Sequence, residues 1–123
     1  NDFVANLMNI RDFNKVKFII LYGSQAIGKA NKMSDYDLAV YFDGLDKEKF
    51  NFLLNANLDS RFDVKIFQDL PLFIKNEVLK GKIIYSKDIS FVYQIAYEVI
   101  EDFEMFKRHY YDYIKTRVLR VRK

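Results

Sequence analysis

The chain has 123 residues, and half of them are hydrophobic, which suits one globular domain with a sizeable core. It contains no cysteine, which excludes disulfides, thiolate metal sites and cysteine nucleophiles and fits a reducing cytoplasm. The formal net charge is +3, and five of the last nine residues are basic. The longest apolar run, residues 18–22, is too short to span a bilayer. We therefore expect a single cytoplasmic domain over residues 1–123 with no membrane segment.

The first elements in chain order are a helix and two strands. Apolar residues at helical spacing predict a short amphipathic helix over residues 2–12. The apolar run 17–22 stops at Gly23 and Ser24, which predicts a buried strand that ends in a tight turn. A polar stretch follows, and residues 37–42 then predict a second buried strand.

The middle of the chain continues with alternating helical and strand patterns. Residues 46–57 place apolar side chains on one face behind an acidic start, which predicts a helix. The alternation over residues 62–67 predicts a third strand. Pro71 marks the start of a further helix that Gly81 ends, and residues 82–85 predict a short edge strand.

A long amphipathic helix is predicted over about residues 90–120, because apolar residues recur there every three or four positions. The fold class is therefore α/β (of the α+β kind), with a small mixed β-sheet and flanking helices in a core of about residues 1–86. A helix of this length extends beyond such a core, so we expect its far end to form an interface. Such an interface could join copies of the chain in a homo-oligomer. The apolar positions are Val92, Ile95, Val99, Phe103, Phe106, Tyr110 and Tyr113.

Three aspartates are candidates for a metal site. Asp35 and Asp37 stand two residues apart where the second strand opens, so their side chains share one face and can converge on a hard cation. Asp63, at the start of the third predicted strand, could complete the site from a neighbouring strand. Three carboxylates exceed what one Mg²⁺ needs and suit the two-metal arrangement for phosphoryl or nucleotidyl transfer.

The turn at Gly23 and Ser24 is the candidate phosphate site. A glycine lets the backbone approach phosphates closely, and the turn N–H groups and the Ser24 hydroxyl can donate to their oxygens. Taken alone, the turn could be an ordinary strand end, and the aspartates could be cap, turn or solvated surface residues. The combination favours nucleotide chemistry.

These motifs together resemble a known family. Gly23-Ser24, followed after ten residues by Asp35-Tyr36-Asp37 and an apolar strand, resembles the signature of the DNA polymerase β-type nucleotidyltransferase superfamily. Asp63 with its strand, then Leu70-Pro71 and residues 81–85, is similar to the way those proteins present their third acid and close their core. The resemblance spans roughly residues 16–85, and the short chain is similar to the minimal nucleotidyltransferases.

Some minimal nucleotidyltransferases are antitoxins of the MntA type, which transfer AMP from ATP to a tyrosine of a HEPN-domain toxin such as HepT. The resemblance implies the same activity and partner here. It also implies that Asp35, Asp37 and Asp63 bind two Mg²⁺ ions and act in catalysis, with Asp63 as a possible general base. Gly23 and Ser24 would bind the triphosphate.

One departure from the family pattern keeps alternatives open. Many relatives carry arginines in the loop after Gly-Ser, where this chain has Gln25 and Ile27, so Lys29 or Lys32 is expected to supply a phosphate contact. The changed loop favours an inactive antitoxin that only covers its toxin. A small-molecule adenylyltransferase, of the aminoglycoside kind, is the other alternative. Basic residues at the C-terminus are more typical of a helix end, where they complement the macrodipole, than of a nucleic-acid site. The sequence does not distinguish ATP from other triphosphates.

Overall fold

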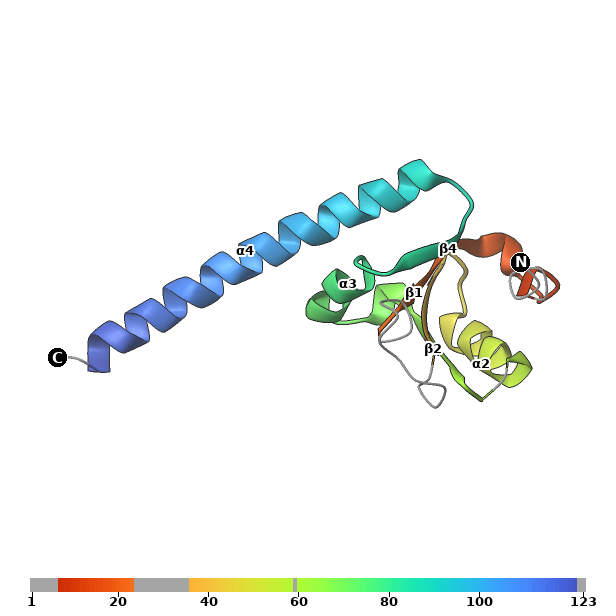
Figure 1. Cartoon of the computed structure of the whole chain (residues 1–123), viewed down its shortest axis with the longest axis horizontal. Helices are drawn as coiled ribbons and strands as arrows, with labels where there is room; N and C mark the ends of the chain where they lie inside the picture. Colours follow the sequence, from red (N-terminus) through yellow and green to blue (C-terminus); the bar gives the residue numbers. More distant parts are fainter. Residues whose placement is uncertain (1–6, 24–35, 59, 122–123) are drawn as a thin grey trace.

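The computed structural model describes residues 7–23, 36–58 and 60–121, with side chains described as far as residue 116. Within these residues, four strands form one sheet, and helices lie on both of its faces (Figure 1). The described elements follow the predicted order. They are the 3-10 turn Phe13–Lys15, β1 (Val16–Tyr22), β2 (Tyr36–Phe42), α2 (Lys47–Asn57), β3 (Phe62–Ile66), the 3-10 turn Phe67–Asp69, α3 (Leu72–Val78), β4 (Lys82–Ser86) and α4 (Ile89–Val121).

Two of the differences between the predicted and observed boundaries have a clear physical reason. The predicted helix over residues 2–12 is helical at residues 7 and 8, its first described positions, and then gives way to turns. Asp12 has a φ of 69°, in the left-handed region, which a continuing α-helix does not allow. β3 ends at Ile66, because Phe67 opens a 3-10 turn in which the Leu70 N–H donates to the Phe67 carbonyl at 3.1 Å.

The sheet is mixed and has the strand order β3-β2-β1-β4. β1 is antiparallel to both β2 and β4, whereas β2 is parallel to β3. Parallel neighbours need a crossover connection, and α2 provides it. The Asp46 carboxylate caps this helix by accepting the Lys49 N–H at 3.0 Å. As a result, β2 and β3 begin at the same edge of the sheet, where β1 ends.

The alternation of side chains along the strands gives the sheet two faces, each with its own core. The face covered by α2 and the N-terminal segment is called the α2 face, and the one covered by α3 and the first turns of α4 is called the α4 face. The core of the α2 face includes Leu7, Phe13, Ile19, Leu38, Val40, Phe42, Phe50, Leu54, Val64 and Ile66. The core of the α4 face includes Phe18, Ile20, Ala39, Phe67, Val78, Val92 and Val99.

β3 lies at the edge of the sheet, and α2 holds it in place. The Asn55 side chain accepts the Val64 N–H at 3.2 Å and donates to the Val64 carbonyl at 3.3 Å. Val64 and Ile66 are buried on the α2 face. Because side chains alternate along a strand, Asp63 and Lys65 must point to the α4 face.

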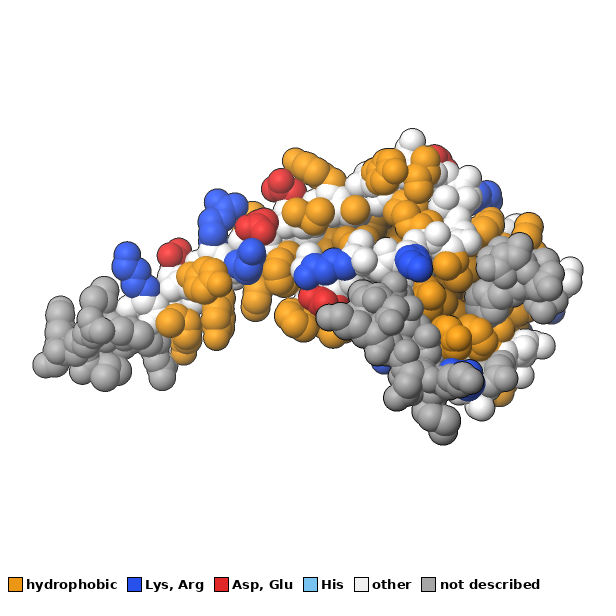
Figure 2. All heavy atoms as spheres, in the orientation of Figure 1, with side chains coloured by type: hydrophobic (Ala, Val, Ile, Leu, Met, Phe, Trp, Pro, Cys, Tyr) orange, Lys and Arg blue, Asp and Glu red, His pale blue; other side chains and the backbone are white. Residues whose placement is uncertain are grey.

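The helix α4 extends far beyond the sheet and α3 (Figure 1). Its first turns pack on the α4 face through Val92 and Val99, but the side chains described beyond Phe103 are exposed, apart from a half-exposed Lys107. Figure 2 shows hydrophobic side chains along this projecting part. Among the residues described, no helix, α4 included, is long and apolar enough to cross a bilayer.

Candidate active site

One edge of the sheet brings together residues from three strands. Tyr22, the last residue of β1, is the register partner of Asp37 in β2, and Asp37 is the register partner of Asp63 in β3. Register partners point to the same face, and neighbouring strands lie about 4.8 Å apart. Tyr22, Asp37 and Asp63 therefore form one row on the α4 face, with two of the three predicted carboxylates side by side.

Gly23 lies directly against the Asp37 carboxylate. Its φ of 80° lies in the left-handed region, which glycine adopts without the steric cost of a Cβ. A Cβ built at Gly23 would stand 2.6 Å from Oδ2 of Asp37. Any larger residue would thus have to displace this carboxylate. The sequence suggested that a glycine here permits close approach to phosphate, and the structure adds a close approach to Asp37.

Asp63 is more exposed than Asp37 and forms an ion pair along its own strand. Its Oδ2 lies 3.7 Å from Nζ of Lys65, and both side chains are about half exposed. An exposed pair of this kind contributes about 0–1 kcal/mol, so it orients the carboxylate weakly and leaves it able to bind a cation. Lys65 was not predicted as a site residue, although its position two residues after Asp63 placed it on the same face.

Tyr22 adds a phenol to the row of carboxylates. Burial raises the pKa of Tyr22 above its ordinary value of 10.0, and the negative charges of Asp37 and then Asp63 raise it further. The phenol is therefore neutral at physiological pH and keeps its O–H as a donor beside the two carboxylates. The sequence analysis missed this residue, because its relation to Asp37 depends on strand register.

An aromatic pair lies at the same strand ends, on the opposite face of the sheet. The rings of Tyr36 and Phe62, which are register partners, stack with centroids 5.0 Å apart and planes 23° apart. The Arg61 guanidinium lies 5.2 Å from the centre of the Tyr36 ring, and the Tyr36 N–H donates to the Arg61 carbonyl at 2.7 Å. Side chains alternate along the strands, so this group lies on the α2 face and ties the first residues of β2 and β3 together.

Three predicted site residues, Ser24, Lys29 and Asp35, lie outside the described residues, and their roles stay predictions. Within the described part of the chain, no group of three or more His, Cys, Asp or Glu side chains is placed to hold a metal ion. That part contributes two neighbouring carboxylates, Asp37 and Asp63. Carboxylate oxygens are ligands that Mg²⁺ prefers, and it commonly takes only one or two of them together with water and substrate phosphates. The described residues therefore fit a magnesium site.

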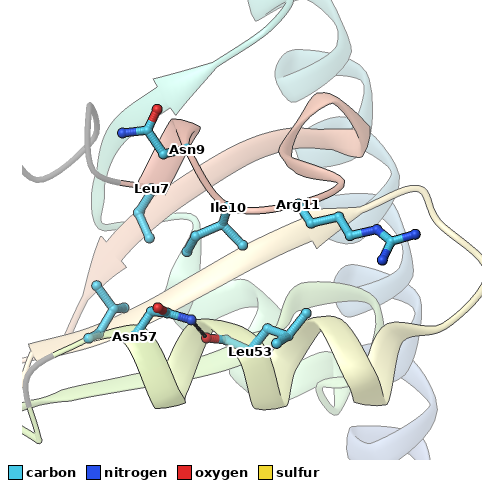
Figure 3. Close-up of a pocket in the computed structure, with 7 residues that line it drawn as sticks. Leu7, Asn9, Ile10, Arg11, Leu53 and Asn57 are labelled. Carbon is cyan, nitrogen blue, oxygen red and sulfur yellow. Dashed lines mark hydrogen bonds between the residues drawn. The ribbon is translucent and has the colours of Figure 1, made fainter.

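A hollow of about 440 Å³ lies elsewhere, between the N-terminal segment and α2 (Figure 3). Leu7 and Ile10 line it from one side, and Leu53 and Asn57 line it from α2. The Asn57 side-chain amide donates to the Leu53 carbonyl of its own helix at 2.7 Å. This hollow lies on the α2 side of the sheet, opposite the face to which Asp37 and Asp63 point, so we place the candidate site at the strand edge.

A mixed sheet that presents neighbouring carboxylates beside a glycine turn is suited to binding metal ions and phosphates for nucleotidyl transfer. The sequence comparison agrees with this class of site. Residues 6–90 match the family described as polymerase beta, nucleotidyltransferase. The match spans more than two thirds of the 123 residues, and the chain belongs to this family.

A relative in Methanocaldococcus jannaschii bears the name "Putative protein adenylyltransferase MJ1547". It is 37% identical to this chain over 78 residues, which are 63% of this chain and 62% of the relative. The chain thus spans less than two thirds of the length of this curated relative.

Solved structures share the fold over nearly the whole chain. A chain in a crystal structure of a toxin–antitoxin with AMP-PNP has a TM-score of 0.73 and 21% identity, and the match covers 94% of this chain and 95% of that one. A chain in a complex of tri-AMPylated Shewanella oneidensis HEPN toxin with MNT antitoxin has a TM-score of 0.66 and 20% identity, covering 94% and 92%. A chain in an MntA–HepT crystal structure has a TM-score of 0.68 and 21% identity, covering 94% and 93%. The predicted fold class is confirmed.

Proposed function

We propose that this protein is a Mg²⁺-dependent nucleotidyltransferase that transfers AMP from ATP to a tyrosine hydroxyl of a HEPN-type toxin, and so acts as an antitoxin in the cytoplasm. The observation that carries the proposal is the row formed by Asp37 and Asp63 beside Gly23, within the core of the nucleotidyltransferase family. The relative named as an adenylyltransferase supports AMP as the transferred group. The toxin–antitoxin structures of the same fold, with AMP-PNP in one and a tri-AMPylated toxin in another, support ATP and the acceptor.

Three carboxylates carry the metal chemistry in this proposal. Asp37 and Asp63 are adjacent on neighbouring strands, and Asp35 precedes Asp37 by two residues in the sequence. Bound Mg²⁺, as two ions, would neutralise the triphosphate charge and lower the pKa of the acceptor hydroxyl. The neutral Tyr22 phenol adds no further negative charge to this row.

The turn after β1 carries the phosphates. The backbone of Gly23 already bends with a positive φ, which directs the chain into the turn. Backbone N–H groups of such a turn and the Ser24 hydroxyl donate to phosphate oxygens. Lys29 adds a positive charge that contacts the phosphates.

The reaction is an in-line displacement at the α-phosphorus of ATP. The tyrosine oxygen attacks this phosphorus and forms the new O–P bond, while the bond between the α-phosphorus and the bridging oxygen breaks and pyrophosphate leaves. Asp63 takes the phenolic proton, because it is the more exposed carboxylate at the edge from which an acceptor can approach. The acceptor hydroxyl belongs to the partner protein. The partner must therefore hold this hydroxyl in line with the α-phosphorus when it docks.

The test is intact-mass measurement of the toxin after incubation with this protein, ATP and Mg²⁺. We expect added mass in whole AMP units and loss of that mass with Asp37→Asn. Asp43→Asn is the matched control, since it makes the same change just beyond the opposite end of β2, where Asp43 pairs with Lys17 at 3.9 Å. Its product should match that of the wild type.

Two other results would replace the proposal. A toxin that is silenced at unchanged mass, equally well by Asp37→Asn, would show an antitoxin that acts by binding alone. Labelling of an aminoglycoside-type small molecule instead of the toxin would show a small-molecule adenylyltransferase.

A further inference from the structure

Lys65 is a cation at the candidate site to which the proposed function gives no role. Its Nζ lies 3.7 Å from Oδ2 of Asp63, and the two side chains are 52% and 50% exposed. A direct N–H···O hydrogen bond needs a separation of about 2.7–3.2 Å, so the ammonium group is paired with this carboxylate without a hydrogen bond to it. A pair of this kind leaves the ammonium group able to move to a stronger anionic partner.

The position of Lys65 on β3 keeps its ammonium group at the row of Tyr22, Asp37 and Asp63. Lys65 stands two residues after Asp63, so both side chains point to the α4 face. The register partner of Lys65 in β2 is Ala39, which is fully buried and has no polar side-chain group to offer. The ion pair with Asp63 therefore turns the lysine side chain back toward the strand edge at which the candidate site lies.

The charge balance of this row changes when a metal ion binds. In the free protein, Lys65 offsets one of the two neighbouring carboxylates, Asp37 and Asp63. A Mg²⁺ ion on Asp63 would compete with the ammonium group for the same carboxylate, and two cations on one carboxylate repel each other. Lysine carries its charge on a long, flexible stem. Its ammonium group can therefore leave Asp63 while the backbone of β3 stays in place.

We propose that Lys65 is a nucleotide-binding residue. Its ammonium group leaves Asp63 when Mg²⁺ binds there, and it then contacts a phosphate oxygen of the triphosphate. This inference rests on the proposed function, which brings both Mg²⁺ and a triphosphate to this edge of the sheet. A triphosphate carries more negative charge than one carboxylate, and lysine binds phosphate well as a point charge. Lys65 thus exchanges one anionic partner for another as the site fills.

Removal of the ammonium group should change the two affinities in opposite directions. Without nucleotide, Lys65 competes with Mg²⁺, so Lys65→Met should bind Mg²⁺ more tightly, by up to about fivefold for an exposed pair. With Mg²⁺ present, Lys65→Met should bind a non-hydrolysable ATP analogue more weakly. The loss should be about 10- to 100-fold, as for a charge-assisted hydrogen bond. A residue that only supports the fold would not separate the two affinities in this way.

Both affinities can be measured on the full chain without the toxin. The Mg²⁺ affinity is taken from the rise of the melting temperature with Mg²⁺ concentration, and the affinity for the ATP analogue is taken from calorimetric titration at saturating Mg²⁺. Lys65→Arg keeps the positive charge and should restore most of the nucleotide affinity that Lys65→Met loses. Circular dichroism checks that each variant is folded.

Lys47→Met is the matched control. Lys47, at the start of α2, forms a similar ion pair with Asp69, with 3.8 Å between Nζ and Oδ1. Asp69 follows the end of β3, so this pair lies at the opposite end of the strand from Asp63. Lys47→Met removes the same charge and should leave both affinities as they are in the wild type.

The possible results separate this inference from the proposed function. If Lys65→Met binds the ATP analogue as tightly as the wild type, or binds Mg²⁺ no more tightly, the exchange by Lys65 is overturned and the proposed function is unaffected. If the wild type binds no nucleotide in the presence of Mg²⁺, both are overturned. The toxin takes no part in these titrations, so a failure to label it counts against the proposed function only.

Discussion

Replacement of Gly23 by alanine should lower both the stability of the fold and the rate of nucleotidyl transfer. A φ of 80° costs an L-residue about 1–2 kcal/mol. The new Cβ would stand 2.6 Å from Oδ2 of Asp37, whereas ordinary contact begins at 3.4 Å, so the carboxylate must retreat by the difference, about 0.8 Å. Turning a side chain away from its preferred rotamer costs about 0.5–1.5 kcal/mol.

The two costs can be separated by a double-mutant cycle with Asp37→Ala. The backbone cost of Gly23→Ala is present in both backgrounds, but the collision exists only where Asp37 keeps its carboxylate. Urea unfolding should therefore show that Gly23→Ala destabilises the Asp37 protein more than the Asp37→Ala protein, by about 0.5–1.5 kcal/mol. An equal loss in both backgrounds would show that Gly23 and the Asp37 carboxylate do not touch.

The activity of Gly23→Ala should fall further than its stability explains. A displacement of about 1 Å in a reacting group costs about 10²-fold in rate, and here the displaced group is a proposed metal ligand. The measurement is the initial rate of AMP transfer at a temperature where circular dichroism shows the variant fully folded. A folded Gly23→Ala protein with wild-type rate would remove this carboxylate position from the mechanism.

Three further outcomes follow from the described contacts. Mg²⁺ or Mn²⁺ should raise the melting temperature of the wild type, because a cation relieves the repulsion of neighbouring carboxylates, and Asp37→Asn should reduce that gain; equal gains would contradict the site. Phe50→Ala should lower the free energy of unfolding, measured by chemical denaturation, by about 3–5 kcal/mol. The reason is that the Phe50 ring is buried and stacks on the Phe42 ring with centroids 4.0 Å apart. Phe52 is 72% exposed, so Phe52→Ala should change this free energy by less than about 0.5 kcal/mol. The raised pKa of Tyr22 means that the folded state holds this proton more tightly, so its contribution to stability is full below about pH 10 and is lost as the pH rises through the raised pKa. Tyr22→Phe should therefore lessen the fall in unfolding free energy above pH 10, and an unchanged slope would refute this.

The strands and the long helix were predictable because their patterns repeat over many residues. Residues 18–22, which precede Gly23, are all apolar, because the strand packs against a core on each face of the sheet. The end of β3 was not predictable in the same way. Phe67 continues the alternation and is buried beside Phe18, with ring centroids 5.3 Å apart, yet it belongs to a turn, because burial alone does not distinguish a strand end from a turn.

In the described part of the candidate site, the sequence pointed to Gly23, Asp37 and Asp63 as residues but not to their arrangement. The spacing of Asp37 and Asp63 suggested strand positions, but their pairing depends on the parallel register that α2 imposes. The contact of Gly23 with Asp37 and the charge environment of Tyr22 both arise between strands, so no local pattern contains them. The two-residue spacing of Lys65 from Asp63 places both side chains on one face of the strand. The 3.7 Å distance between Nζ of Lys65 and Oδ2 of Asp63 shows that they form an ion pair there.

The two hydrogen bonds between the Asn55 side chain and the Val64 backbone limit the ways in which a protein acceptor can bind beside the candidate site. Peptides are often recognised by adding a strand to an exposed sheet edge, which requires outward amide and carbonyl groups that are available for pairing. At β3 those groups of Val64 are already bound by the Asn55 side chain. An extended peptide therefore cannot pair with the backbone of Val64, next to Asp63. If the proposed transfer to a tyrosine is correct, the acceptor is selected by the three-dimensional shape of a folded partner, and a short peptide with the same local sequence should be a poor substrate.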